Sequence, residues 1–152
     1  MKTLAIDYGE KRIGLAISDE LGIIASPMPT LKVKSLADAV SKIHGIALSQ
    51  GVEFIVIGLA RGRQREETQQ SIQTRYFATA LEATNGIKVD FWDETFSTQQ
   101  AEQSLSKGSK RKKQNLDSEA ARIILQGYLD YQKEKQKISG YIPQYSNNLL
   151  FK

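Results

Sequence analysis

The sequence contains no cysteine, which excludes a disulfide framework, a cysteine-ligated zinc site and a cysteine nucleophile. It contains a single histidine, His44, inside an expected helix, so an imidazole is a poor candidate for a catalytic base. No apolar run approaches the ~20 residues that a membrane-spanning helix needs. Asp7 also interrupts the first apolar stretch too early for a signal peptide. We therefore expect a soluble, cytoplasmic protein that makes no membrane contact.

The chain has 152 residues, a size typical of one domain that buries its core without disulfides or structural metals. Its formal net charge of +4 mildly favours a polyanionic partner. Many of its cations fall in two short runs, which comprise Arg61, Arg63 and Arg65 in one and Lys107, Lys110, Arg111, Lys112 and Lys113 in the other. Such runs are typical of solvated loops as well as of nucleic-acid-binding surfaces, and composition alone favours the loops.

Hydrophobic periodicity predicts three short strands, followed by alternating helices and strands. The predicted strands are 3–7, 12–18, 23–26, 53–59 and 87–92. The predicted helices are 36–50, 69–85, 98–106 and 117–135, with loops at 60–68 and 107–115. An antiparallel meander joined to crossover units predicts an α/β fold, in which helices flank a mixed five-stranded sheet. We expect one domain at 1–137 and a C-terminal extension at 138–152.

The predicted helices have apolar faces that should pack on the sheet. These faces are Leu36, Val40, Ile43 and Ala47 in the first helix, Ile72, Tyr76, Ala80 and Ala83 in the second, and Leu116, Ala120, Ile124 and Tyr128 in the last. The strand at 53–59 is nearly all apolar, which is typical of a central parallel strand buried on both faces.

Three acidic residues stand where open α/β sheets place their sites, at the carboxyl ends of strands. Asp7 ends the first strand, Glu94 follows the last strand, and Asp117 is expected to open the final helix. Converging carboxylates without matching bases repel one another, and a divalent cation such as Mg²⁺ relieves that repulsion. Hydrolysis of a phosphodiester bond is the natural chemistry of such a site.

Each acid also has a simpler interpretation. Asp7 could cap the turn at Gly9, Asp117 could favour a helix N-terminus, and Glu94 could be an exposed loop residue. Only convergence in space favours a site over these alternatives. Gly9 and Gly14 suit either ordinary hairpin turns or the close approach of a substrate backbone.

Four segments carry a resemblance to a known family. They are Asp7–Ala16 (DYGEKRIGLA), Ile57-Gly58-Leu59, Asp93–Thr98 (DETFST) and Asp117–Leu125 (DSEAARIIL). In this order they resemble the motifs of the YqgF/RuvX family, over roughly residues 1–133. Two positions depart from the family pattern: Thr95 stands where an arginine is usual, and Ala60-Arg61 stands where a proline and a polar loop are usual.

The resemblance implies an RNase H-like fold and a nuclease that needs Mg²⁺ or Mn²⁺ and trims the 5′ end of precursor 16S rRNA. It implies that Asp7, Glu94 and Asp117 are the catalytic, metal-binding residues. With this family in view, the cations expected to bind nucleic acid are Arg12, Arg61, Arg63, Lys110, Arg111, Lys112 and Lys113. The expected partners are precursor 16S rRNA or structured DNA and the assembling small ribosomal subunit, with the chain itself a monomer or a weak homodimer.

Three rival interpretations stay open. One is a Holliday junction resolvase-like DNA nuclease, which would need a dimer with two sites. Another is a non-catalytic nucleic-acid-binding factor in ribosome assembly, which Thr95 favours mildly and the three retained acids disfavour. The last is an actin-like phosphotransferase, which also has Asp-x-Gly after its first strand but needs a second, similar domain, for which a chain of this length is too short unless it dimerises.

Overall fold

The computed structural model describes residues 1–59, 67–93 and 112–141, and the side chains of all of these except 85, 112–115 and 137–141. Its strands are β1 (Thr3–Asp7), β2 (Arg12–Ser18), β3 (Ala25–Lys32), β4 (Phe54–Leu59) and β5 (Lys88–Asp93). Its helices are α1 (Leu36–Gln50), α2 (Gln69–Asn85) and α4 (Lys112–Tyr141). The predicted loop at 60–68 and helix at 98–106 lie wholly or mostly outside the described residues.

The five strands form one mixed sheet in the order β3-β2-β1-β4-β5. β2 pairs antiparallel with both β1 and β3, whereas β4 pairs parallel with both β1 and β5. This arrangement confirms the predicted meander joined to crossover units. Because β1, β4 and β5 are mutually parallel, their carboxyl ends meet at one end of the sheet.

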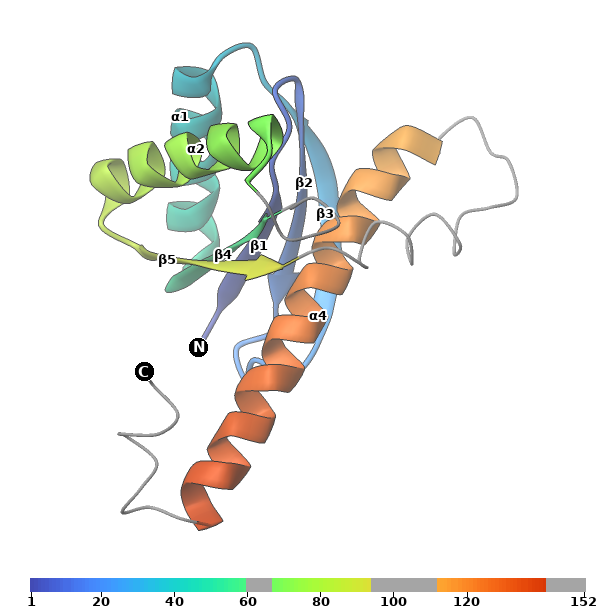
Figure 1. The fold of residues 1–152 in the computed structure, drawn as a ribbon, viewed down its shortest axis with the longest axis vertical. Helices are drawn as coiled ribbons and strands as arrows, with labels where there is room; N and C mark the ends of the chain where they lie inside the picture. Colours follow the sequence, from blue (N-terminus) through green and yellow to red (C-terminus); the bar gives the residue numbers. More distant parts are fainter. Residues whose placement is uncertain (60–66, 94–111, 142–152) are drawn as a thin grey trace.

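Helices cover both faces of the sheet: α1 and α2 lie on one face, and the long α4 crosses the other (Figure 1). Side chains alternate between the faces, as the two-residue period of a strand requires. Leu4 and Ile6 of β1 belong to the core under α1 and α2, while Ala5 between them belongs to the core under α4. Every residue of β4 is buried, which confirms its prediction as a central strand. No helix within the described ranges is long and apolar enough to cross a membrane.

The third strand was predicted wrongly as ending before Pro27. β3 continues through Pro27 and Pro29 to Lys32 and pairs with β2 along its length. An edge strand tolerates proline because the N–H groups on its open side need no partner within the sheet. The pairing of β2 with β3 shifts register between Ile13 and Leu15, which is a β-bulge opposite Gly14.

The last helix is longer than predicted at both ends. α4 begins at Lys112 and ends at Tyr141, so residues 112–115 are helical rather than part of a basic loop, and Asp117 lies one turn inside the helix. The predicted face of Ala120, Ile124 and Tyr128 is buried against the sheet, as expected. The helix also continues past 138, where we expected the C-terminal extension to begin.

The first two helices differ in how well their buried faces were predicted. In α1, Val40, Ile43 and Ala47 are buried as predicted, although Leu36 is 41% exposed. In α2 the predicted face was mostly wrong: Ile72 and Tyr76 are 40% and 69% exposed, and Ala83 is exposed, whereas Ala80 packs against the core.

A different face of α2 packs on the sheet, and it includes Phe77, Leu81 and two hydroxyl residues, Ser71 and Thr74. These hydroxyls can be buried because they donate to backbone carbonyls: Ser71 Oγ to Thr68 O at 2.8 Å and Thr74 Oγ1 to Gln70 O at 2.8 Å. A pattern search based on apolar residues alone does not count them, so it selects the wrong face.

Candidate active site

Asp7 stands at the carboxyl end of β1, on the face of the sheet that α4 covers. Leu4 and Ile6 point to the opposite face, so Ala5 and Asp7 point toward α4. Across the sheet Asp7 pairs with Gly14 of β2, which lies on the same face as Ala16. The carboxylate of Asp7 therefore stands at the end of the sheet, beside a residue that has no side chain.

Asp117 of α4 lies directly over Gly14. A Cβ atom built on Gly14 would overlap the backbone carbonyl of Asp117 and would lie 3.1 Å from its Cβ atom. Asp7 and Asp117 therefore flank the same glycine, one beside it in the sheet and the other above it. The sequence left Gly14 open as an ordinary hairpin glycine or as a point of close approach for a substrate backbone, and the backbone that approaches it is that of α4.

The start of α4 is fixed on β3 by the residue after Asp117. The buried Ser118 Oγ donates to the carbonyl of Met28 at 2.7 Å and lies 2.9 Å from Thr30 Oγ1. Thr30 lies in the bulge opposite Gly14, and Met28 pairs with Leu15 next to it. The bulge and this hydrogen bond thus set where Asp117 sits on the sheet.

The carboxyl group of Asp117 is not satisfied by the described residues. Its Oδ2 atom is buried and accepts no hydrogen bond from them, although Arg12 Nε lies 3.2 Å away in an ion pair. Burial raises the pKa of the Asp117 carboxyl above its ordinary value, and the charge of Arg12 offsets part of that rise. A buried carboxylate oxygen that is ion-paired but accepts no hydrogen bond from the described residues is a suitable ligand for a hard cation.

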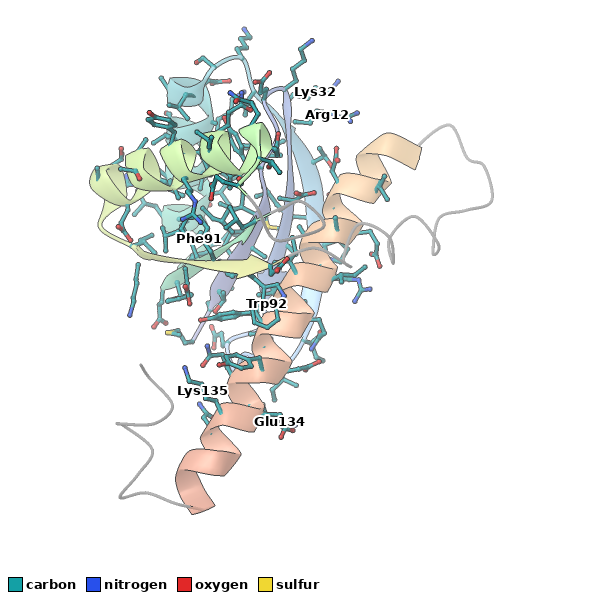
Figure 2. All side chains as sticks on the ribbon, viewed as in Figure 1. Arg12, Lys32, Phe91, Trp92, Glu134 and Lys135 are labelled. Atoms are coloured by element: carbon teal, nitrogen blue, oxygen red, sulfur yellow. The ribbon has the colours of Figure 1, made fainter. Side chains whose placement is uncertain are left out.

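Positively charged side chains lie at the start of β2, at the same end of the sheet as Asp7 and Asp117. Arg12, the first residue of β2, pairs across the sheet with Lys32, the last residue of β3. Figure 2 shows both side chains at the end of the sheet near the start of α4, far from Glu134 and Lys135 near the other end of that helix. Arg12 is one of the predicted nucleic-acid-binding residues, whereas Lys32 was not predicted, because the predicted third strand stopped before it.

The remaining predicted site residues are only partly described. Glu94, Arg61, Arg63, Lys110 and Arg111 lie outside the described residues. Lys112 and Lys113 form the first turn of α4, and their side chains are not described. Within the described ranges there is no cluster of three or more potential metal ligands, and what the structure shows of the predicted acids is that Asp7 and Asp117 both adjoin Gly14.

Two aromatic residues close to the predicted acids in the sequence pack between the sheet and a helix. Tyr8 stacks on Phe77 of α2 with ring centroids 4.4 Å apart. Trp92 packs edge-on against Tyr128 of α4 at 5.8 Å, within the core on that face. Both rings join a helix to the sheet.

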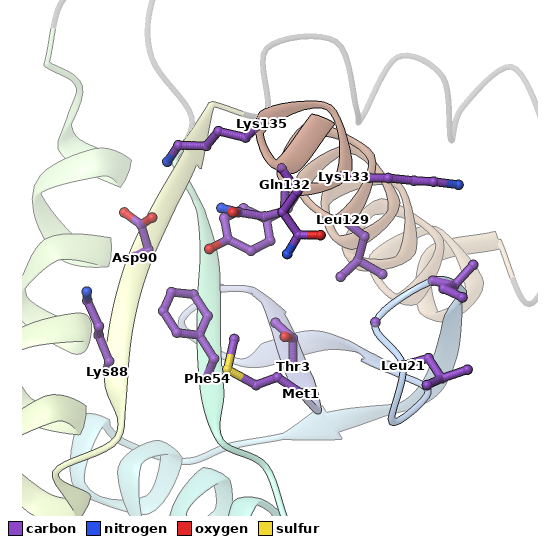
Figure 3. A pocket seen from close by; sticks show the side chains of 14 residues that line it. Met1, Thr3, Leu21, Phe54, Lys88, Asp90, Leu129, Gln132, Lys133 and Lys135 are labelled. Carbon is purple, nitrogen blue, oxygen red and sulfur yellow. The ribbon is translucent and has the colours of Figure 1, made fainter. Parts of the chain in front are cut away.

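A pocket of about 570 Å³ opens at the opposite end of the sheet (Figure 3). Its lining includes the first residues of β1, β4 and β5, which are Thr3, Phe54 and Lys88. Among the described residues that line it, Asp90 is the only acid. A lone carboxylate beside Lys88 does not form a metal centre. We therefore place the candidate site at the carboxyl ends of the strands.

Comparisons with known proteins agree with this fold. The sequence matches the family described as "RuvX: Holliday junction resolvase" over residues 1–131. A Dictyoglomus thermophilum protein named "Putative pre-16S rRNA nuclease" is 43% identical over 136 residues, which cover 86% of this chain and 96% of that protein. A Syntrophus aciditrophicus protein of the same name is 41% identical over 133 residues, which cover 86% and 89% of the two chains.

Solved structures give the fold. RuvC of T. thermophilus in complex with a Holliday junction substrate matches with a TM-score of 0.59 at 14% identity, covering 88% of this chain and 96% of that one. The fowlpox virus Holliday junction resolvase matches with a TM-score of 0.51 at 14% identity, covering 86% and 99%. The fold is therefore RNase H-like, as predicted, and the chain belongs to the RuvX family.

Proposed function

We propose that this protein is a metal-dependent nuclease that hydrolyses phosphodiester bonds at the 5′ end of precursor 16S rRNA. The observation that carries the proposal is the placement of Asp7 and Asp117 around Gly14, where a buried Asp117 oxygen is ion-paired with Arg12 but accepts no hydrogen bond from the described residues. The names of the two relatives support the substrate. The proposed catalytic and metal-binding residues are Asp7, Glu94 and Asp117.

The donor set fits a hard divalent cation because it offers carboxylate oxygens, and the buried Asp117 Oδ2 atom accepts no hydrogen bond from the described residues, although a bound cation would share it with the Arg12 ion pair. A bound Mg²⁺ or Mn²⁺ ion would supply Lewis-acid chemistry to the phosphodiester and to the attacking water. Asp7 and Asp117 would hold the ion from the sheet and from α4. Arg12 and Lys32 would attract the phosphate backbone, and the proposed cations Arg61, Arg63, Lys110, Arg111, Lys112 and Lys113 would extend that surface.

We further propose that residues 1–137 form the nuclease domain and that residues 138–152 form a C-terminal extension. We propose that the protein acts in the cytoplasm. The proposed partners are the precursor rRNA and the assembling small ribosomal subunit. A second candidate function is the resolution of four-way DNA junctions, which the description of the matching family favours. That activity would require two sites in a dimer.

The first experiment is cleavage of a labelled precursor 16S rRNA 5′-leader by the purified protein, with Mg²⁺, Mn²⁺ or EDTA. We expect cleavage with either metal and none with EDTA. A four-way DNA junction and a linear duplex of the same sequence are compared in parallel. Cleavage of the junction but not of the RNA would mean that the substrate is DNA and would favour the second candidate function. Binding without cleavage in every metal would favour a non-catalytic assembly factor.

Metal binding can be tested without an activity assay. Burial raises the pKa of the Asp117 carboxyl in the folded protein above its value in the unfolded chain. The protonated carboxyl is therefore tolerated at low pH, and the folded state loses stability as the pH rises through the folded pKa. At neutral pH the ionised carboxylate destabilises the metal-free fold. Asp117→Asn should therefore raise the melting temperature in EDTA at pH 7. The difference should shrink as pH falls toward about 4, the ordinary range of an aspartate pKa.

The same variant should lose its response to metal. At ten times the dissociation constant, a bound ion stabilises the fold by about 1.4 kcal/mol, roughly 3–6 °C for a chain of this size. We expect that rise for the unmodified protein and none for Asp117→Asn. A lower melting temperature of the variant in EDTA, or an equal response to Mg²⁺, would contradict the assignment of Asp117.

A further inference from the structure

A cleft of about 650 Å³ lies beside the candidate carboxylates, and the proposed catalytic residues do not account for most of its lining. One wall is the turn between β1 and β2, and the other is the start of α2. The described residues that line the cleft are Gly9, Glu10, Lys11, Arg12, Gln69, Gln70, Gln73 and Asp117. A nucleic-acid strand that placed a phosphate at Asp117 would have a neighbouring nucleotide in this cleft.

The two walls of the cleft are held together. Gln70 Nε2 of α2 donates to the carbonyl of Tyr8 at 2.8 Å, and the ring of Tyr8 stacks on Phe77 of the same helix. Tyr8 directly follows Asp7 in the sequence. The amide of Gln70 therefore supports the turn that carries the candidate carboxylate, and the width of the cleft is fixed by these contacts.

The other two glutamines on this wall are available to a ligand. In the described part of the chain, the amide groups of Gln69 and Gln73 make no hydrogen bond, and Gln69 is exposed while Gln73 is half-buried. Residues four apart on a helix lie on the same side, so both amides project from one side of α2. Each offers two donors and an acceptor without carrying charge.

The turn that lines this cleft carries two cations and one acid, Glu10. Lys11 and Arg12 line the same cleft, and Arg12 also pairs with Asp117. Cations suit phosphate oxygens, whereas neutral amides suit base edges and the 2′-hydroxyl, which is itself both a donor and an acceptor. The two walls together match the two chemically different parts of a nucleotide.

We propose that this cleft binds the nucleotide adjacent to the cleaved phosphodiester, with Lys11 and Arg12 on its phosphate and Gln69 and Gln73 on its sugar or base. The inference rests on the proposed nuclease function and adds two specificity-determining residues to it. Because the amide contacts carry no charge, they contribute affinity that does not depend on salt, unlike the contacts of Lys11.

The test compares Gln69→Ala/Gln73→Ala with Gln132→Ala/Gln136→Ala, a matched pair with the same spacing on α4 that lines the pocket at the opposite end of the sheet. Single-turnover cleavage of the 5′-leader RNA is measured against protein concentration. The first pair should raise the half-saturating concentration about 10- to 30-fold, as expected for two neutral hydrogen bonds. The maximal rate should stay within about threefold, and the control pair should change neither quantity.

The salt dependence of binding distinguishes the charged contacts of Lys11 from the neutral contacts of the glutamines. Lys11→Ala should reduce the slope of log affinity against log salt by about one, whereas the glutamine variants should leave the slope unchanged. Gln73→Glu, which keeps the size of the side chain and adds a negative charge, should weaken binding more than Gln73→Ala. Leader RNAs with single 2′-deoxy or base substitutions then identify the group that the glutamines contact. A substitution at that group should weaken binding by the unmodified protein but not by the glutamine variants.

Two outcomes would overturn the inference in distinguishable ways. If the unmodified protein cleaves RNA and the glutamine pair behaves like its control, the cleft is not a nucleotide subsite and the nuclease function stands. If the unmodified protein neither cleaves nor binds any nucleic acid tested, the proposed function fails and the subsite fails with it.

Discussion

Asp7→Asn is expected to reduce the rate of RNA cleavage by on the order of 1000-fold, since a metal ligand at the reacting phosphate contributes several kcal/mol to the transition state. Asp7 stands at the end of the central strand, beside Gly14 and on the face that carries Asp117. Asparagine has the same shape and keeps one oxygen, but it lacks the charge that holds a divalent ion. The measurement is the single-turnover rate at saturating Mg²⁺.

The fold should survive this change. Asp7 is only half-buried, and the strand pairing of β1 uses its backbone rather than its carboxylate. The melting temperature in EDTA should therefore stay close to that of the unmodified protein. Asp130→Asn, an exposed isosteric change on α4 far along the helix from Asp117, is the control and should leave the rate unchanged. A fully active Asp7→Asn protein would refute the proposed site.

The sheet was predictable from the sequence because its pattern is strong and local. The apolar runs Leu4-Ala5-Ile6 and β4 predict buried strands. Gly51 ends α1 in the left-handed conformation that glycine adopts readily, with φ of 68°. The meander followed by crossover units then leaves few possible topologies. These elements predict a mixed five-stranded sheet, whereas the order of its strands comes from the structure.

Other features depend on tertiary contacts that no local pattern encodes. The prolines of β3 suggested an ending, yet they are tolerated because β3 is at the edge of the sheet. The buried face of α2 includes Ser71 and Thr74, whose hydroxyls are satisfied by backbone carbonyls of the same helix or its cap. Both errors arise where position in the fold overrides residue preference.

The pair of candidate acids was predictable in kind but not in geometry. Their places at the end of β1 and near the start of the last helix suggested convergence, and the family resemblance supported it. The role of Gly14 was not predictable, because the contact joins residues 14 and 117 across about a hundred positions of sequence. Similarly, Gln70 reaches the carbonyl of Tyr8 only because α2 packs against that turn.

Gly14→Ala is expected to impair both the fold and the activity. A Cβ atom at this position would overlap the carbonyl of Asp117, and backbone atoms cannot move aside without shifting α4 along the sheet. Overpacking of this kind costs about 1–3 kcal/mol of unfolding free energy. A shift of about 1 Å in Asp117 would also lower the cleavage rate by on the order of 100-fold. Thermal unfolding and single-turnover cleavage measure the two effects.

Gly45→Ala provides the matched comparison. Gly45 lies within α1, and a Cβ atom there would meet nothing within 4 Å, so alanine should stabilise the helix by about 0.5–1 kcal/mol. Cleavage by Gly14→Ala is measured well below its melting temperature, where the variant is folded, so that a slow rate reports the displaced carboxylate rather than unfolded protein. A Gly14→Ala protein with unchanged stability and full activity would mean that α4 does not rest on this glycine, and the convergence of Asp7 with Asp117 would lose its structural basis.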